Sequence, residues 1–165
     1  MRNKLGFTLI EMLVVVLIIG ILANIALPQY KMAVAKTRYA AFKNNARAIA
    51  NSAEVFYLVQ DRYPTKYEEL DIEVDGVKLK EEGERHTIIY LKDGSRCEIW
   101  FNSGGVACRG KIFGKEMVYS HPFNGTLRQC DALGSDKNDI QHRLCKAETN
   151  DENPNCGDWC YYNYQ

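Results

Sequence analysis

Residues 7–27 read FTLIEMLVVVLIIGILANIAL, and this stretch decides the fold of the chain. As an α-helix, 21 residues span about 31 Å, close to the thickness of the hydrocarbon core of a membrane. Glu11 lies near the start of this otherwise apolar run. A lone carboxylate there costs at least ~2.5–3.5 kcal/mol on insertion, and such residues usually mark function. The stretch therefore predicts a membrane-spanning helix that carries one functional acidic residue.

The residues around Glu11 resemble a known processing signal. The hexapeptide GFTLIE at residues 6–11, preceded by Arg2 and Lys4, is similar to the signal of type IV pilins and of their relatives, the type II secretion pseudopilins. The resemblance implies that a prepilin peptidase and N-methyltransferase cleaves after Gly6 and methylates the amine of Phe7. It also implies that Glu11 pairs with the Phe7 amine of a neighbouring subunit in a helical filament.

Residues 7–62 are predicted to form one long helix, followed by a loop at Pro64. From Tyr30 onward the helix is amphipathic, because apolar residues recur at steps of four and three. These residues are Ala35, Tyr39, Phe42, Ala46, Ile49, Ala53 and Phe56. Pro28 removes one backbone hydrogen bond, so the helix either kinks there or divides into two. Pro28 also matches the pilin pattern, which implies a gentle kink.

The chain is expected to be an α+β protein with the pilin fold: a long helix packed against a small antiparallel sheet with disulfides. The expected parts are a leader (1–6), a transmembrane and filament-core half-helix (7–28), an amphipathic half-helix (29–62) and a β-rich head (63–165). Residues 65–70 suggest a short helical turn. Strands are predicted at 87–92 and 96–101 around the Asp93-Gly94 turn, at 105–109 and at 117–120.

Six cysteines in the C-terminal half predict a disulfide framework and an oxidising compartment. Zinc is disfavoured because no CxxC pair is present and the histidines are not spaced as ligands. A tight turn at residues 102–103 places Cys97 opposite Cys108, within bonding distance. The remaining pairs stay open to exchange: Cys130–Cys145 resembles the C-terminal disulfide-bounded loop of pilins, and Cys156–Cys160 closes a small ring.

No other ligand site or catalytic set is predicted, so the chain is expected to be a structural protein without a cofactor or metal. Asp136, Asn138 and Asp139 could offer oxygen atoms to calcium, but they fit a solvated Asx turn better. The chain has 21 basic and 21 acidic residues, and this balance does not favour nucleic acid. The basic residues Lys36, Arg38, Lys43 and Arg47 are expected to meet lipid head groups or neighbouring subunits.

The expected function is that of a type IV pilus-type filament subunit. The precursor sits in the bacterial inner membrane, with Arg2 and Lys4 in the cytoplasm and the head in the periplasm. After processing, a pilus or secretion assembly platform builds it into a homopolymer on the cell surface, and the sequence leaves open a role in adhesion, motility or secretion. The alternatives are a type II secretion pseudopilin, a minor pilin, and an unrelated single-pass anchored domain that never polymerises.

Overall fold

The computed structural model describes residues 7–74, 76–81 and 86–165. The expected leader, including the cleavage residue Gly6, lies outside the described residues. The chain divides into two compact units, residues 1–34 and residues 35–165. Each unit is described by itself below.

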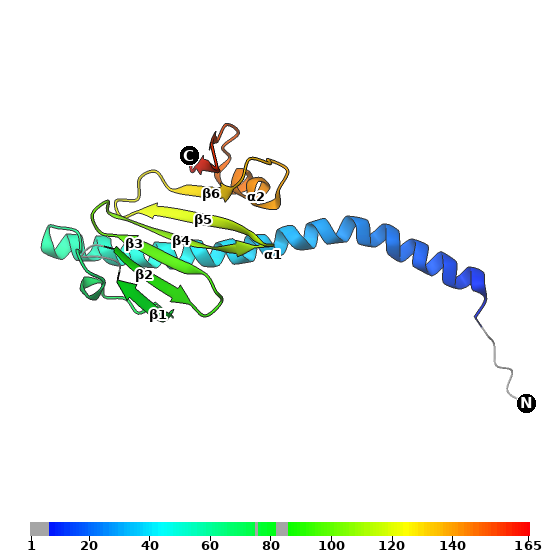
Figure 1. The fold of residues 1–165 in the computed structure, drawn as a ribbon, viewed down its shortest axis with the longest axis horizontal. Coiled ribbons are helices and arrows are strands. Elements are labelled where there is room, and N and C mark those ends of the chain that lie inside the picture. Colours follow the sequence, from blue (N-terminus) through cyan, green and yellow to red (C-terminus); the bar gives the residue numbers. More distant parts are fainter. Residues whose placement is uncertain (1–6, 75, 82–85) are drawn as a thin grey trace, which may run out of the picture. The chain divides into compact units, whose positions relative to one another are not determined.

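Two α-helices, one short 3₁₀ helix and eight strands form within the described residues (Figure 1). Their bounds are α1 Leu9–Gln60, η1 Tyr67–Glu69, β1 Gly76–Glu81, β2 His86–Leu91, β3 Arg96–Trp100, β4 Gly105–Ile112, β5 Lys115–Pro122, β6 Gln129–Leu133, α2 Ile140–Thr149, β7 Asn155–Cys156 and β8 Trp159–Asn163. Helix followed by antiparallel sheet confirms the predicted α+β class.

Helix α1 is shorter than the predicted helix by two residues at each end, and it passes through Pro28 without a break. The two-helix alternative is therefore wrong. At the C-terminal end, Asp61 adopts a left-handed φ of 53°, which cannot continue a right-handed helix. Its amide donates a last hydrogen bond of 2.8 Å to the carbonyl of Tyr57. Local backbone geometry at Asp61, three residues before Pro64, thus ends the helix.

The strands form one antiparallel sheet in the order β1-β2-β3-β4-β5-β6-β8-β7 (Figure 1). Strands β2 to β5 are the predicted ones, although β4 and β5 run further and meet at a hairpin turn around Phe113-Gly114. Strands β1, β6, β7 and β8 and helix α2 were not predicted. The short turn expected at 65–70 is present as η1.

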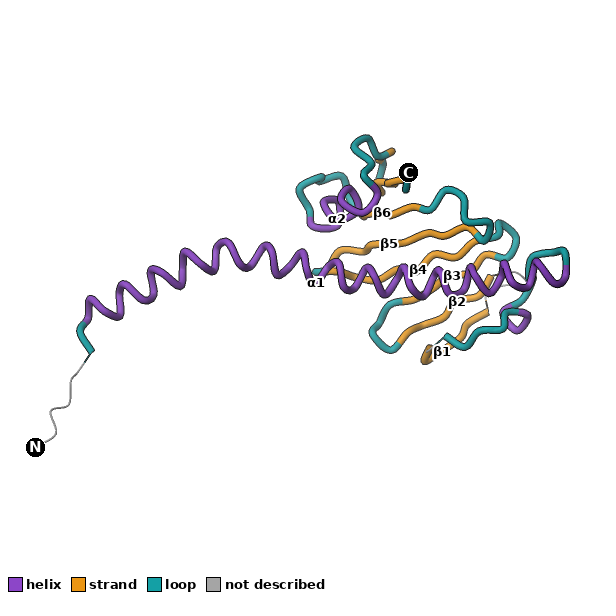
Figure 2. Tube along the Cα trace, turned by 180° about the vertical axis from the view of Figure 1, so that it is seen from behind, coloured by secondary structure: helices purple, strands orange, loops and turns teal. Residues whose placement is uncertain are grey.

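The head-unit part of α1, residues 35–60, covers one face of the sheet, as the opposite views of Figures 1 and 2 show. Six of the seven residues of the predicted apolar stripe are buried against it, and Ala50 joins them. The rings of Tyr39 and Tyr119 meet edge to face at 5.9 Å. Phe56, at the end of the stripe, is half-buried, with the Arg62 guanidinium 4.9 Å from its ring centre.

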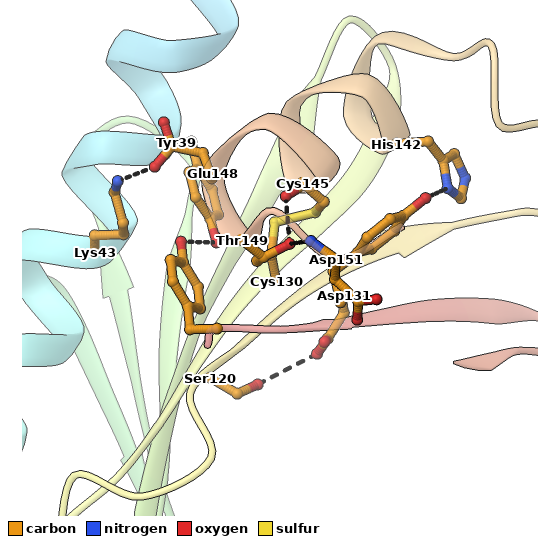
Figure 3. Close-up of a disulfide and its surroundings, with 12 residues drawn as sticks. Tyr39, Lys43, Ser120, Cys130, Asp131, His142, Cys145, Glu148, Thr149 and Asp151 are labelled. Carbon is orange, nitrogen blue, oxygen red and sulfur yellow. Dashed lines mark hydrogen bonds and ion pairs between the residues drawn. A yellow bond between two sulfur atoms is a disulfide. The ribbon is translucent and has the colours of Figure 1, made fainter. Parts of the chain in front are cut away.

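Helix α2 is fixed to the sheet by the Cys130–Cys145 disulfide, which joins it to β6 (Figure 3). Three residues further along α2, Glu148 pairs with Lys43 of α1. The C-terminal strand β8 adds a third tie, because the Tyr162 hydroxyl lies 3.0 Å from Nδ1 of the buried His142.

Asp131 lies on the opposite face of β6 from Cys130, because neighbouring side chains alternate along a strand. It is buried, and burial raises its pKa to about 6. The Ser120 hydroxyl, which donates a 3.2 Å hydrogen bond to Oδ2, and the nearby Arg109 oppose this shift only partly. Oδ1 has no hydrogen-bond partner, so the ionised form of Asp131 is poorly stabilised.

Asp131→Asn is therefore expected to stabilise the head at neutral pH. The pKa of Asp131 in the folded protein, about 6, lies above the value of 3.8 for an unperturbed Asp. Asp131 therefore lowers the stability of the wild-type fold only as the pH rises from about 4 through 6. The gain should be near zero below pH 4 and reach ~2–3 kcal/mol by pH 8. Urea unfolding of both proteins across this pH range measures it, and an equal difference at pH 4 and pH 8 would contradict the prediction.

Candidate functional site in the N-terminal helix

Thr8 and Glu11 form a reciprocal cap at the start of α1. The Glu11 carboxylate accepts hydrogen bonds from the backbone N–H of Thr8 at 2.7 Å and from its hydroxyl at 2.6 Å. The Glu11 amide lies 3.4 Å from the Thr8 hydroxyl oxygen. This is the capping-box arrangement, in which residues three apart satisfy N–H groups that lack helical partners. Within a single chain, Glu11 therefore stabilises the first turn of the helix.

The side chains that follow the cap are mostly apolar and are exposed. From Phe7 to Leu27, the large apolar side chains have exposed fractions between 45% at Val15 and 77% at Leu9. By length and composition, α1 is able to cross a membrane. Monomeric soluble proteins rarely expose contiguous apolar patches of this extent. This part of α1 is consequently a surface for lipid or for other protein chains.

Phe7 and Glu11 line one open surface pocket, together with Ile10, Val14 and Val15. A free amine at Phe7 would thus lie close to the only charged side chain of residues 7–27. Pro28 lies inside α1, beyond the apolar run. The pairing of Glu11 with a neighbour's amine, and the roles of Gly6 and Pro28, remain predictions from the sequence.

The structure contains three disulfide bonds, and they are the pairs that the sequence suggested. They join Cys97 to Cys108, Cys130 to Cys145 and Cys156 to Cys160. Cys97 and Cys108 are direct partners in the β3–β4 ladder. The loop expected between Cys130 and Cys145 is only partly a loop, since α2 begins at Ile140. All three bonds lie in the head.

The candidate calcium ligands form an Asx turn, as the sequence favoured. The Asp136 carboxylate accepts a 3.0 Å hydrogen bond from the amide of Asn138, and Asp139 pairs with Lys115. Among the described residues, no group of three or more His, Cys, Asp or Glu side chains is arranged to hold a metal ion.

Sequence reasoning missed one feature of the site. The pattern Thr-x-x-Glu at residues 8–11, directly before an apolar run, is itself the signature of a capping box. It gives Glu11 a role within its own chain, beside the predicted pairing with a neighbouring subunit. A test of Glu11 must therefore separate helix capping from contacts between subunits.

Comparison with known proteins places these features in a family. Residues 1–27 match the family described as the prokaryotic N-terminal methylation motif. The chain is 44% identical over 62 residues to the type IV major pilin protein PilA of Myxococcus xanthus (strain DK1622), covering 38% of this chain and 28% of PilA. It is 46% identical over 54 residues to a fimbrial protein of Pseudomonas aeruginosa, covering 33% of this chain and 35% of that protein.

A third relative is similar over most of its length. The type II secretion system core protein G of Aeromonas hydrophila is 27% identical over 139 residues, which cover 81% of this chain and 93% of that protein. By contrast, the matched region spans about a third of PilA and of the fimbrial protein. No solved structure matches the chain significantly. The methylation motif, these relatives and the α+β fold together make the chain similar to type IV pilins and type II secretion pseudopilins.

Proposed function

We propose that the chain is the structural subunit of a type IV pilus-type filament. It enters the inner membrane as a precursor, is cleaved after Gly6, is methylated on the Phe7 amine and is then polymerised. In the membrane the apolar run contacts lipid, and in the filament it contacts the same run of neighbouring subunits. The proposal rests on one observation above all: an exposed apolar run, residues 7–27, whose single acidic residue is Glu11, four residues after Phe7.

The apolar run is stable only where it is kept out of water, in lipid or among the helices of a filament. Each Leu, Ile, Val or Phe side chain that is fully removed from water stabilises the bound state by ~1.5–3 kcal/mol. The large side chains of residues 7–27 are exposed in the single chain. Lipid keeps these side chains out of water before assembly, and neighbouring helices do so afterwards.

Glu11 supplies the specificity that apolar packing lacks. Apolar helices slide past one another at little cost, whereas an unpaired charge inside such a bundle is strongly destabilising. In the filament, the Glu11 carboxylate pairs with the methylated amine of Phe7 on an adjacent subunit. Only one axial offset between the helices forms this pair, so Glu11 fixes the register.

The orientation of the precursor follows from its flanking charges. Arg2 and Lys4 hold the N-terminus on the cytoplasmic side, and the head then lies in the periplasm. The three disulfides of the head suit that oxidising compartment. After assembly the head forms the filament surface outside the inner membrane.

A type II secretion pseudopilin is the second candidate. The similarity to core protein G extends along 93% of that protein, whereas the similarity to PilA spans 28% of PilA. Both candidates share processing and polymerisation, but a pseudopilin filament stays in the periplasm. The place where the processed protein accumulates therefore separates them.

The test is intact mass and N-terminal sequencing of protein from native membranes and from material sheared off the cells. N-methylated Phe7 in the sheared fraction supports the pilus subunit. The same N-terminus confined to membranes supports the pseudopilin or a minor component. An intact Met1 in both fractions would overturn the proposal and favour an anchored domain that does not polymerise.

Gly6→Leu is expected to trap the precursor, because a branched side chain replaces the small residue at the scissile bond. In the same mass measurement, the variant should keep Met1–Gly6 and lack the added methyl group. Asn3→Leu is the matched control, since it places the same side chain in the leader away from the bond. Normal processing of Gly6→Leu would disprove the cleavage site.

A further inference from the structure

One stripe of exposed residues on α1 in the head unit carries no charge. Seven exposed residues recur there at steps of four and three, opposite the buried stripe. We name this set the outer stripe: Thr37, Ala41, Asn44, Ala48, Asn51, Val55 and Leu58. Surface helices usually place charged residues on the face opposite the core. An uncharged face of this length, ending in side chains as exposed as Leu58 at 80%, suits contact with another protein surface.

Basic residues border the outer stripe along its first half. Residues 29–47 contain five basic residues and no acidic one. Lys43 is used within the chain, in its ion pair with Glu148. Lys36, Arg38 and Arg47 are exposed, and within the described part of the chain no ion pair joins them to an acidic residue. We name these three residues the basic flank.

Acidic residues gather in the segment that follows α1. Residues 61–74 contain five acidic and two basic residues, a net charge of −3. Arg62 and Glu69 neutralise each other through a contact of 2.8 Å. The remaining acidic residues are exposed and, across the residues that the structure describes, have no ion-pair partner. We name them the acidic exit: Asp61, Glu68, Asp71 and Glu73.

The basic flank lies on α1, whereas the acidic exit begins one residue after α1 ends. Asp61 directly follows α1, and the Arg62 guanidinium packs against Phe56 in its last turns. Arg47 and Lys36 precede Asp61 by 14 and 25 residues, or about 21 and 38 Å of helix. Two parallel copies in register would set basic flank beside basic flank, whereas two copies displaced by that distance would set basic flank beside acidic exit.

We infer that the outer stripe and basic flank of one subunit dock against the acidic exit of a second copy, displaced along the helix axis by about 21–38 Å as measured to Asp61. The inference rests on the proposed function, because it requires that the chain polymerises. The contact uses different surfaces on its two partners, and repetition of such a contact produces an open helical filament. Opposite charges favour the displaced arrangement, and like charges oppose the in-register one.

The inference is tested by reversing the charges in the full-length chain, expressed with its own assembly machinery. K36E/R47E and E68K/D71K should each reduce the filament yield in the sheared or membrane-bound polymer fraction about tenfold or more, since like charges then face each other. The quadruple variant restores opposite charges and should recover most of the wild-type yield. Raising the salt concentration should loosen wild-type filaments, because exposed pairs are screened.

Controls separate this contact from folding and from membrane effects. K137E/R143E makes the same charge change at two exposed cations elsewhere in the head and should leave yield unchanged. Thermal unfolding of each purified full-length variant checks that the head still folds. A different result would overturn the inference: K36E/R47E lowers the filament yield, E68K/D71K does not, and the quadruple variant does not recover. That result would indicate that the basic flank contacts an anionic membrane surface instead. Wild-type yield in every variant would also overturn it, whereas a wild-type chain that never polymerises would refute the proposed function itself.

Discussion

Replacing Glu11 with Gln is expected to abolish filament assembly while leaving the membrane helix and the head intact. Gln still accepts the Thr8 hydrogen bonds that cap α1, because Gln serves as well as Glu at this position of a capping box. It cannot neutralise the Phe7 amine of a neighbour. Leaving one member of a buried pair unpaired costs about 3–5 kcal/mol, so polymer yield should fall by more than about a hundredfold. Quantification of sheared and membrane-bound polymer measures this loss.

Thr8→Ala is the matched control for Glu11→Gln. It removes the hydroxyl that contacts the Glu11 carboxylate at 2.6 Å but keeps the charge. Loss of a cap costs a helix only about 0.5–2 kcal/mol, and the surrounding bilayer or filament holds the rest of α1. Thr8→Ala should therefore still assemble. The reverse result, with Glu11→Gln assembling and Thr8→Ala failing, would show that capping is the role of Glu11.

Gly110→Ala is expected to destabilise the head, because the added Cβ would meet neighbouring atoms more closely than at the other glycines whose surroundings the structure describes. A Cβ at Gly110 would lie 2.8 Å from Cζ of Phe42 and 3.0 Å from Cβ of Ser95. Phe42 is buried, so its ring has no free space into which to move. Overpacking of this kind costs about 1–3 kcal/mol. Urea unfolding of the full-length protein in detergent should show this loss as a lower midpoint.

Two further variants make the Gly110 prediction specific. Gly105→Ala changes the same strand, but its new methyl group would meet its neighbours at an ordinary 3.6 Å, so little change is expected. Phe42→Leu shortens the side chain that causes the clash. In the double variant with Gly110→Ala, the two losses should be less than additive. Strict additivity would show that Phe42 is not the source of the strain.

The sequence predicted the parts of the fold that depend on local patterns. The alternating steps of the buried stripe placed the core face of α1, and the Asp93-Gly94 turn placed the β2–β3 hairpin. Strand β6 and helix α2 escaped prediction. QCDAL in β6 and IQHRLCKAET in α2 are short, carry polar residues and lack the regular spacing of a surface element. The Cys130–Cys145 bond and the Lys43–Glu148 pair hold them in place, and such long-range ties cannot be read from a local window.

The sequence likewise predicted some residues of interest and missed others. A single charge in an apolar run identified Glu11, and family similarity agrees with the prediction that the chain is a structural protein and not an enzyme. The buried position of Asp131 was not predictable, because Asp131 faces away from the helices and is enclosed by side chains of neighbouring strands. The pKa of Asp131 is raised because the pairing of β6 with its neighbouring strands buries this residue. The sequence alone did not predict the strands beyond β5 or their register.

The order of the disulfides along the chain has a consequence for how the head matures. Each cysteine is bonded to the next one in sequence, so no bond encloses or crosses another. If the chain emerges into an oxidising compartment with its N-terminal part first, each cysteine meets its native partner before a wrong one becomes available. Sheet neighbours from β1 to β6 are likewise consecutive in sequence, and such local pairing favours rapid folding. We therefore expect the native bonds to form during translocation, with little need for an isomerase to rearrange them.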